Sequence, residues 1–252
     1  TRYVTPLKEG GSLPAIAEAD DEFLYVVKFR GAGQGPKALI ADLIGGEIAR
    51  SAGLKVPELV FAMLDESFGR TEPDPEIQDL LKASTGKNLG VHFLKGAATF
   101  DPALTRVDGL LASKIVWLDS FLMNVDRTVK NTNLLLWKKE LWLIDPGASL
   151  YFHHSWDNYK EKAILPFQQI KDHVLLPFAD RMDEADQWFH AHLSDELLRY
   201  IVGLVPEEWL LVDTPFSSYD ENRNAYVDFL TTRFHQSAHF VNHVRDAREA
   251  II

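Results

Sequence analysis

The chain has 252 residues, of which 46% are apolar and 25% are charged, so it can bury a large core as one domain or as two packed lobes. Its net charge of −11 argues against sequence-independent binding to nucleic acid, and its lack of cysteine excludes disulfides and thiolate metal sites. No apolar run approaches the length that spans a bilayer, and the first residues show no signal-peptide pattern, so we expect a cytoplasmic protein without a membrane partner.

Residues 1–95 are expected to form a lobe of strands around one helix. β-branched and aromatic residues predict three strands, at residues 21–29, 56–64 and 89–94. Apolar residues at helical spacing predict a helix over residues 37–54, between the first two of these strands. The glycine-rich stretch GAGQG at 31–35 precedes this helix, and we interpret it as a flexible connection. A polar stretch at 65–88 separates the second strand from the third.

From Leu104 onward, helical periodicity prevails to the end of the chain. One hairpin interrupts it, because residues 133–137 and 141–144 are short apolar runs joined by a polar loop of suitable length. The whole pattern predicts an α+β protein with two lobes, a β-rich N-lobe at 1–95 and a mainly helical C-lobe at 96–252. Small-molecule sites commonly lie in the cleft between such lobes.

The hairpin predicts a site for magnesium and a nucleotide. Folding it brings Asp145 back beside Asn131, and this oxygen pair suits Mg²⁺, which proteins hold with few side chains plus substrate phosphates. Asp126 lies five residues before Asn131. An Asp that orients a hydroxyl, an Asn five residues later and a metal-binding Asp that opens an Asp-x-Gly form the arrangement of kinases. Each residue alone fits ordinary turn chemistry, but the three together favour the site.

Lys28 is the candidate cation for the α- and β-phosphates of ATP. It is the only charge in an apolar strand run, where a lysine is costly unless it is paired or bound to an anion. The alternative is a lysine at a strand end that reaches into water. A partner carboxylate should come from the following helix, where Asp42 and Glu47 are both available. They point roughly 140° apart on a helix, so only one of them can face Lys28.

Backbone groups should hold the rest of the nucleotide. Gly10, Gly11 and Ser12 can fold over the phosphates through their N–H groups. The other glycine cluster follows the strand lysine, whereas the phosphate loop of a kinase precedes it. Phe93 and Leu94 lie just before the helical lobe, where a kinase-like fold has its interlobe hinge. We therefore expect their backbone to meet the edge of the adenine.

Several stretches that occur in order resemble the HipA-like kinase family, specifically its compact members. They are GGSLP, YVVKFRGAGQGPKALIADL, ARSAGLKVPE, WLDSFLMNVDRTVKNTNLLLW and LIDPGASLYF. Together they cover most of residues 1–155. The Asp-Arg that opens the catalytic loop and the five-residue step to Asn are shared more distantly with phosphatidylinositol kinases. Counted back from AGLKVP, the family's helix Glu corresponds to Asp42 in this chain, which favours Asp42 over Glu47.

The resemblance implies a two-lobed protein-kinase-like fold, the use of ATP and Mg²⁺, and phosphoryl transfer to a Ser or Thr of an unidentified protein. It would make Asp126 the catalytic Asp and Asn131 and Asp145 the metal ligands. Lys28 would be the phosphate-binding lysine, and Gly10 to Ser12 the phosphate loop. Two alternatives remain open, a nucleotide-binding pseudokinase that acts as an interaction module and a small-molecule or lipid kinase of the same fold. Retention of all the reactive residues favours activity, and the lack of a basic excess disfavours a lipid substrate.

Overall fold

The computed structural model describes residues 2–6, 14–33, 35–67 and 72–252. The first half of the chain contains β1 (Arg2–Pro6), β2 (Ala15–Glu18), β3 (Leu24–Lys28), α1 (Pro36–Ser51), β4 (Leu59–Leu64), α2 (Pro75–Ala83), β5 (Gly86–His92) and β6 (Ala98–Thr99). The second half contains α3 (Gly109–Leu122), β7 (Leu134–Trp137), β8 (Glu140–Leu143), α4 (Tyr159–Ile164), α5 (Met182–His192), α6 (Asp195–Gly203), α7 (Glu207–Leu210), α8 (Tyr219–His235) and α9 (Ser237–Glu249). Short 3₁₀ turns lie between β8 and α5, at Pro146–Ala148, Tyr151–His154, Gln168–Asp172 and Leu176–Phe178.

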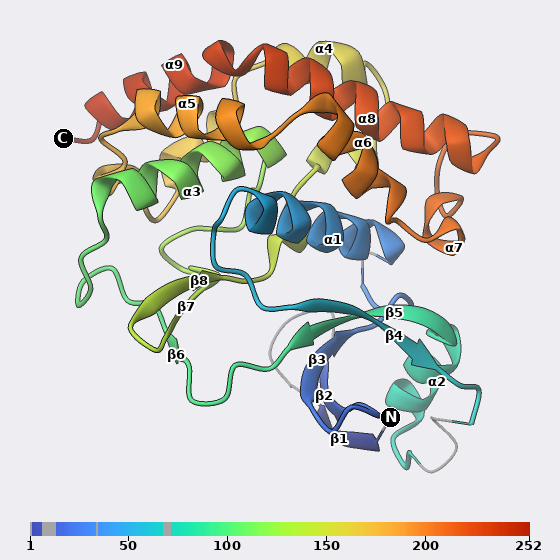
Figure 1. The fold of residues 1–252 in the computed structure, drawn as a ribbon. Helices are drawn as coiled ribbons and strands as arrows, with labels where there is room; N and C mark the ends of the chain where they lie inside the picture. Colours follow the sequence, from blue (N-terminus) through green and yellow to red (C-terminus); the bar gives the residue numbers. More distant parts are fainter. Residues whose placement is uncertain (1, 7–13, 34, 68–71) are drawn as a thin grey trace.

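The strands form two antiparallel sheets. The larger sheet has the order β1-β2-β3-β5-β4, and the smaller one has the order β6-β7-β8. Figure 1 shows the larger sheet curled at the opposite end of the molecule from α8 and α9. Lys28 ends β3, where it pairs with Leu89 of the neighbouring strand β5. Lys28 therefore lies at the end of the central strand of the sheet, where it contacts Asp42 of α1.

Helix α1 begins and ends with the residues expected of a helix. Gly35 precedes it with a φ of 65°, Pro36 occupies the first turn, and Gly53 follows it with a φ of 75°. Almost the whole helix is buried, which includes the charged side chains of Asp42 and Glu47. In Figure 1, α1 lies beneath α3, α5 and α6.

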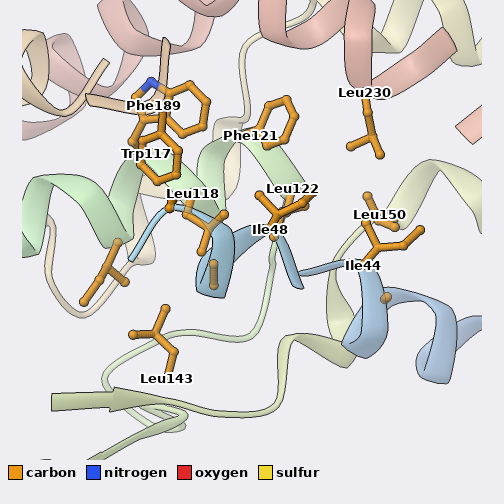
Figure 2. Packing of buried hydrophobic residues seen from close by; sticks show 14 of the residues in the cluster. Ile44, Ile48, Trp117, Leu118, Phe121, Leu122, Leu143, Leu150, Phe189 and Leu230 are labelled. Atoms are coloured by element: carbon orange, nitrogen blue, oxygen red, sulfur yellow. The ribbon is translucent and has the colours of Figure 1, made fainter. Parts of the chain in front are cut away.

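The main hydrophobic core joins α1 to the helices of the second half. Ile44 and Ile48 of α1 pack in one cluster with Leu118 and Leu122 of α3 (Figure 2). The larger sheet has a smaller core of its own, built from side chains such as Tyr25, which does not include α1. The division at residue 95 stays a prediction, and α1 is the element whose packing does not follow it.

The fold class predicted from the sequence is confirmed, with an antiparallel sheet region followed by a helical remainder and an internal hairpin. The three predicted strands, the helix and the hairpin are all present, with ends displaced by up to a few residues. The prediction did not include β1, β2, β6 or α2, and α2 lies inside the stretch that was interpreted as a polar separator. Within the described residues, no helix has the length and apolar character to cross a bilayer.

Candidate active site

The structure brings the predicted reactive side chains into one cavity. This cavity of about 350 Å³ lies between the end of β3, the first turns of α1 and the two loops that flank the hairpin. Its lining includes Lys28, Asp42, Asp126, Asn131 and Asp145. These residues lie up to 117 positions apart in the chain, and the fold gathers them as the sequence predicts. We call it the reactive cavity.

Two asparagine side chains orient the carboxylate of Asp126. Asn131 donates from Nδ2 to Asp126 Oδ2 at 2.7 Å, and Asn133 donates to the same oxygen at 3.3 Å. Both amides therefore leave the other carboxylate oxygen of Asp126 free of their hydrogen bonds. They also leave Oδ1 of Asn131 available as an acceptor or metal ligand, because an amide donates only through its nitrogen.

Lys28 stands between two carboxylates. Its Nζ lies 2.6 Å from Asp42 Oδ2 and 2.5 Å from Asp145 Oδ1. Of the two partners considered from the sequence, Asp42 thus contacts Lys28, while Glu47 pairs with Arg50 one turn along the helix. The ammonium holds α1 and the Asp-Pro-Gly turn together at the edge of the sheet.

The charges in this cluster shift one another's pKa values. Burial alone would lower the pKa of Lys28, but the two carboxylates outweigh it and raise that pKa above 10.5. Burial would raise the pKa of Asp145, but Lys28 outweighs it and lowers that pKa below 3.8. For Asp42 burial dominates and raises the pKa to about 7, against the pull of Lys28. Asp42 is therefore the carboxylate of the cluster that accepts a proton first as the pH falls.

Two glycines permit the close approach of α1 to the Asp-Pro-Gly turn. A Cβ on Gly45 would lie 3.0 Å from the Cβ of Pro146. A Cβ on Gly147 would lie 3.0 Å from Asp42 Oδ2 and 3.3 Å from Asp145 Oδ1. Glycine is costly inside a helix, and at Gly45 it allows the contact that sets Asp42 beside Asp145.

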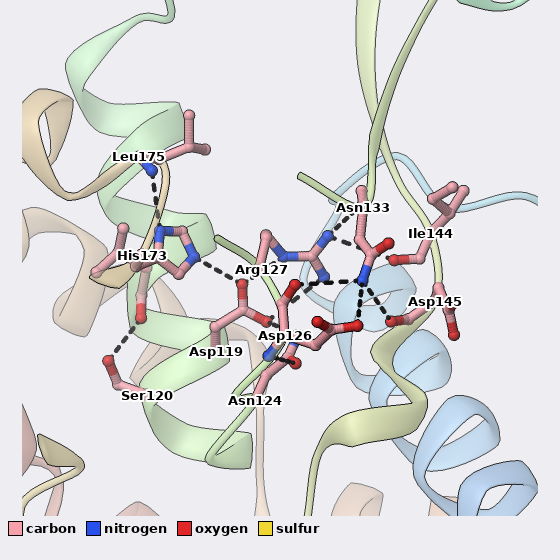
Figure 3. A network of polar contacts seen from close by, with 11 residues as sticks. Asp119, Ser120, Asn124, Asp126, Arg127, Asn133, Ile144, Asp145, His173 and Leu175 are labelled. Atoms are coloured by element: carbon pink, nitrogen blue, oxygen red, sulfur yellow. Dashed lines mark hydrogen bonds and ion pairs between the residues drawn. The ribbon is translucent and has the colours of Figure 1, made fainter. Parts of the chain in front are cut away.

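Arg127, the residue after Asp126, ties the hairpin to helix α3. Its guanidinium donates to the carbonyl oxygens of Asn133 and Ile144, at the two ends of the hairpin, and to the carboxylate of Asp119 on α3 (Figure 3). The side chain is only 1% exposed. In the sequence, Arg127 was recognisable only as part of the Asp-Arg pair, and no sequence signal identified Asp119.

A second, larger cavity of about 1020 Å³ adjoins the reactive cavity and shares Asn131 and Asp145 with it. Thr99, Phe100 and Ile144 contribute to its lining. The lining residues of the two cavities do not include Phe93 or Leu94, within the described part of the chain. The N–H of Phe93 also donates to the carbonyl of Leu24 at 2.8 Å, so this group is already occupied.

Of the two glycine-rich stretches considered from the sequence, the structure describes most of the second. Gly10, Gly11 and Ser12 lie outside the described residues. The interpretation of residues 31–35 as no more than a connection is wrong, because Gly33 and Gly35 line the reactive cavity. Both have positive φ, 44° and 65°, a backbone conformation that favours glycine. The repeated glycines of this stretch were the sequence signal that it lines the cavity. The signal was misinterpreted because the stretch follows Lys28 in the chain, whereas a kinase phosphate loop precedes the strand lysine.

The donor atoms around the shared wall of the cavities fit a hard divalent cation. Asn131 and Asp145 offer an amide and a carboxylate oxygen, and Oδ1 of the buried Asp42 has no hydrogen-bond partner. Among the described residues, no group of three or more His, Asp or Glu side chains is arranged to hold a metal alone.

Comparison with known proteins agrees with this geometry. A family model described as HipA-like kinase matches residues 2–242. The comparison with curated proteins finds no match. The fold is similar to the crystal structure of the Helicobacter pylori proinflammatory kinase CtkA, with a TM-score of 0.56 and 12% sequence identity over 100% of this chain and 97% of that one. At this identity the likeness to CtkA is one of fold.

Proposed function

The chain belongs to the HipA-like kinase family, and from that premise we propose that it transfers the γ-phosphate of ATP, with Mg²⁺, to a Ser or Thr hydroxyl of a protein. The observation that carries the proposal is the reactive cavity itself. It unites a cation, a carboxylate with a free oxygen and an oxygen pair suited to metal, as phosphoryl transfer requires.

Each side chain has a distinct role in this proposal. Lys28 gives up its contact with Asp145 and binds the α- and β-phosphates. Its contact with Asp42 is retained and holds the ammonium close to those phosphates. Asn131 and Asp145 would hold Mg²⁺, which neutralises charge on the β- and γ-phosphates when it is bound. The larger cavity offers room for the adenosine, and the contact of Phe93 and Leu94 with the adenine edge stays a prediction.

Asp126 acts on the acceptor. Its free carboxylate oxygen accepts a hydrogen bond from the Ser or Thr hydroxyl and orients it for in-line attack. The bond from the hydroxyl oxygen to the γ-phosphorus forms as the bond from that phosphorus to the β,γ-bridging oxygen breaks, and ADP leaves. The hydroxyl proton passes to Asp126.

Labelled ATP tests the reaction and its acceptor. The protein is incubated with labelled ATP and Mg²⁺, alone, with cell lysate and with lipid vesicles, and the labelled product is identified. We expect a labelled protein Ser or Thr. Label on a lipid or small molecule would overturn the acceptor class, and no label in any sample would favour the pseudokinase alternative.

Two variants separate binding from chemistry. Asp126→Asn should keep ATP affinity within a few-fold while transfer falls by about 10² or more, because Asp126 orients the acceptor and not the nucleotide. Asp145→Ala should lose the Mg²⁺-dependent part of the rise in melting temperature that ATP produces. An unchanged Mg²⁺-dependent rise in Asp145→Ala would contradict the assigned metal ligand.

A further inference from the structure

Two buried polar residues outside the catalytic loop contact each other behind the reactive cavity. Asp119 on α3 is 0% exposed, and His173, which follows the 3₁₀ turn at Gln168–Asp172, is 5% exposed. His173 Nε2 lies 2.9 Å from Asp119 Oδ2. Neither residue lines the reactive cavity or the larger one. Burying such groups costs free energy unless all their polar atoms have hydrogen-bond partners. The partners of this pair therefore show which parts of the chain it stabilises.

The hydrogen bonds fix the state of the histidine. The N–H of Leu175 donates to Nδ1 of His173 at 3.0 Å, so this nitrogen is the unprotonated one. Nε2 therefore carries the hydrogen and donates to Asp119. Burial lowers the pKa of His173, which agrees with a neutral ring. Asp119 then keeps its full negative charge for Arg127.

Asp119 uses its carboxylate to hold the catalytic loop at two points. Arg127 donates to it from Nε at 2.5 Å. Asn124 donates to its other oxygen at 2.9 Å and in turn accepts the N–H of Asp126 at 3.1 Å. The backbone N–H of Asp126 is thus connected to helix α3 through Asn124 and Asp119.

The segment that carries His173 also contacts the catalytic loop through its backbone. Thr128 and His173 form an isolated β-bridge, and the N–H of Val174 donates to the carbonyl of Arg127 at 3.1 Å. The guanidinium of Arg127 donates hydrogen bonds to the carbonyl oxygens of Asn133 and Ile144, at the two ends of the hairpin. Ile144 directly precedes Asp145, so this connection runs from His173 to Asp126 and Asp145, two of the three acidic residues of the reactive cavity.

We propose that Asp119 and His173 are positioning residues for phosphoryl transfer, which through Arg127 and Asn124 fix Asp126 relative to Asp145. The proposal rests on the proposed kinase function. The two residues touch neither nucleotide nor acceptor in this arrangement. They contribute by aligning Asp126 and Asp145, which do touch the substrates. A misalignment of about 1 Å lowers the catalytic rate of an enzyme more than it lowers the affinity for substrate.

The test compares two substitutions at His173. His173→Leu removes the donor to Asp119 and leaves the Asp119–Arg127 pair in place. We expect kcat to fall by about 10- to 100-fold, with KM for ATP within about threefold of the wild type. His173→Gln places an amide N–H₂ where Nε2 was, and should restore kcat to within about threefold. If His173→Leu does not fold, His173→Asn replaces it, because its shorter amide does not reach Asp119.

A matched control separates alignment from general destabilisation. His153→Leu makes the same substitution at another buried histidine, which contacts Tyr226 and lies outside the connection described above. It should leave kcat unchanged at a temperature well below the melting temperatures of all variants.

Three results would overturn the proposal. One is a folded His173→Leu with wild-type kcat, and another is a rise in KM for ATP with kcat unchanged. The third is equal loss of kcat in His173→Gln and His173→Leu. If the wild type transfers no phosphate at all, the proposed function fails first and this inference fails with it.

Discussion

Replacing Lys28 by methionine should let the protein bind a divalent cation without nucleotide. Lys28 Nζ lies 2.5 Å from Asp145 Oδ1. A Mg²⁺ or Mn²⁺ bound to that oxygen at roughly 2.1 Å would therefore lie at most about 4.6 Å from the ammonium. With an effective dielectric of about 20, a divalent and a univalent cation at that separation repel by about 7 kcal/mol.

Lys28 can move aside and relieve most of this repulsion. We therefore expect a gain of at least about tenfold in affinity, or ~1.4 kcal/mol, when its charge is removed and Asp42 and Asp145 are left facing each other. The assay is Mn²⁺ binding without nucleotide, followed by calorimetry or by the signal of free Mn²⁺ in electron paramagnetic resonance. It requires no phosphoryl transfer.

Two further variants make the result specific. Lys130→Met removes the same charge from the exposed lysine beside Asn131 and should change the affinity little. Asp145→Ala in the Lys28→Met background should abolish the gain. Equal Mn²⁺ affinities in the wild type and Lys28→Met would refute the reasoning, and so would a gain that survives the loss of Asp145.

Two other predictions follow from the contacts around the site. Gly147→Ala should weaken the binding of Mg²⁺ with ATP by about tenfold or more, because its Cβ would crowd Asp42 and Asp145. Gly203→Ala, where a Cβ meets nothing within 4 Å, is the control, and equal affinities in both variants would contradict the crowding. Arg127 and His173 outweigh burial and lower the pKa of Asp119 from 3.8 to about 2. The stability this gives, roughly 2 kcal/mol, is complete above pH 3.8 and is lost as the pH falls toward 2. Urea unfolding should show that loss in the wild type and not in Asp119→Asn.

The sequence predicted the elements whose residues act locally. The strand at 24–28 and the hairpin strands β7 and β8 have dense apolar and β-branched side chains, and the structure has them close to their predicted positions. Strand β2, with the sequence AIAE, has little strand propensity and is held by its neighbours β1 and β3. Pairing with neighbouring strands determines the conformation of such a segment, and the strand propensities of its own residues do not predict it.

In the candidate site, too, the residues with a local sequence signal were predicted and those that meet only through the fold were not. Asp126, Asn131 and Asp145 were recognisable because their spacing along one hairpin predicts their proximity. Asp119 and His173 are 54 positions apart, and each is an ordinary polar residue in its own stretch of sequence. Only the folded chain shows that His173 contacts the Asp119 carboxylate to which Arg127 also donates. A buried polar pair of this kind carries no periodic or local signal.

The burial of α1 in the main core fixes one side of the reactive cavity. A swing of α1 away from the Asp-Pro-Gly turn would expose Ile44 and Ile48 to water, and exposing each such side chain costs about 1.5–3 kcal/mol. Asp42 is therefore preorganised before any ligand arrives. The entropy of assembling the helix side of the cavity is therefore lost during folding and not when a ligand binds.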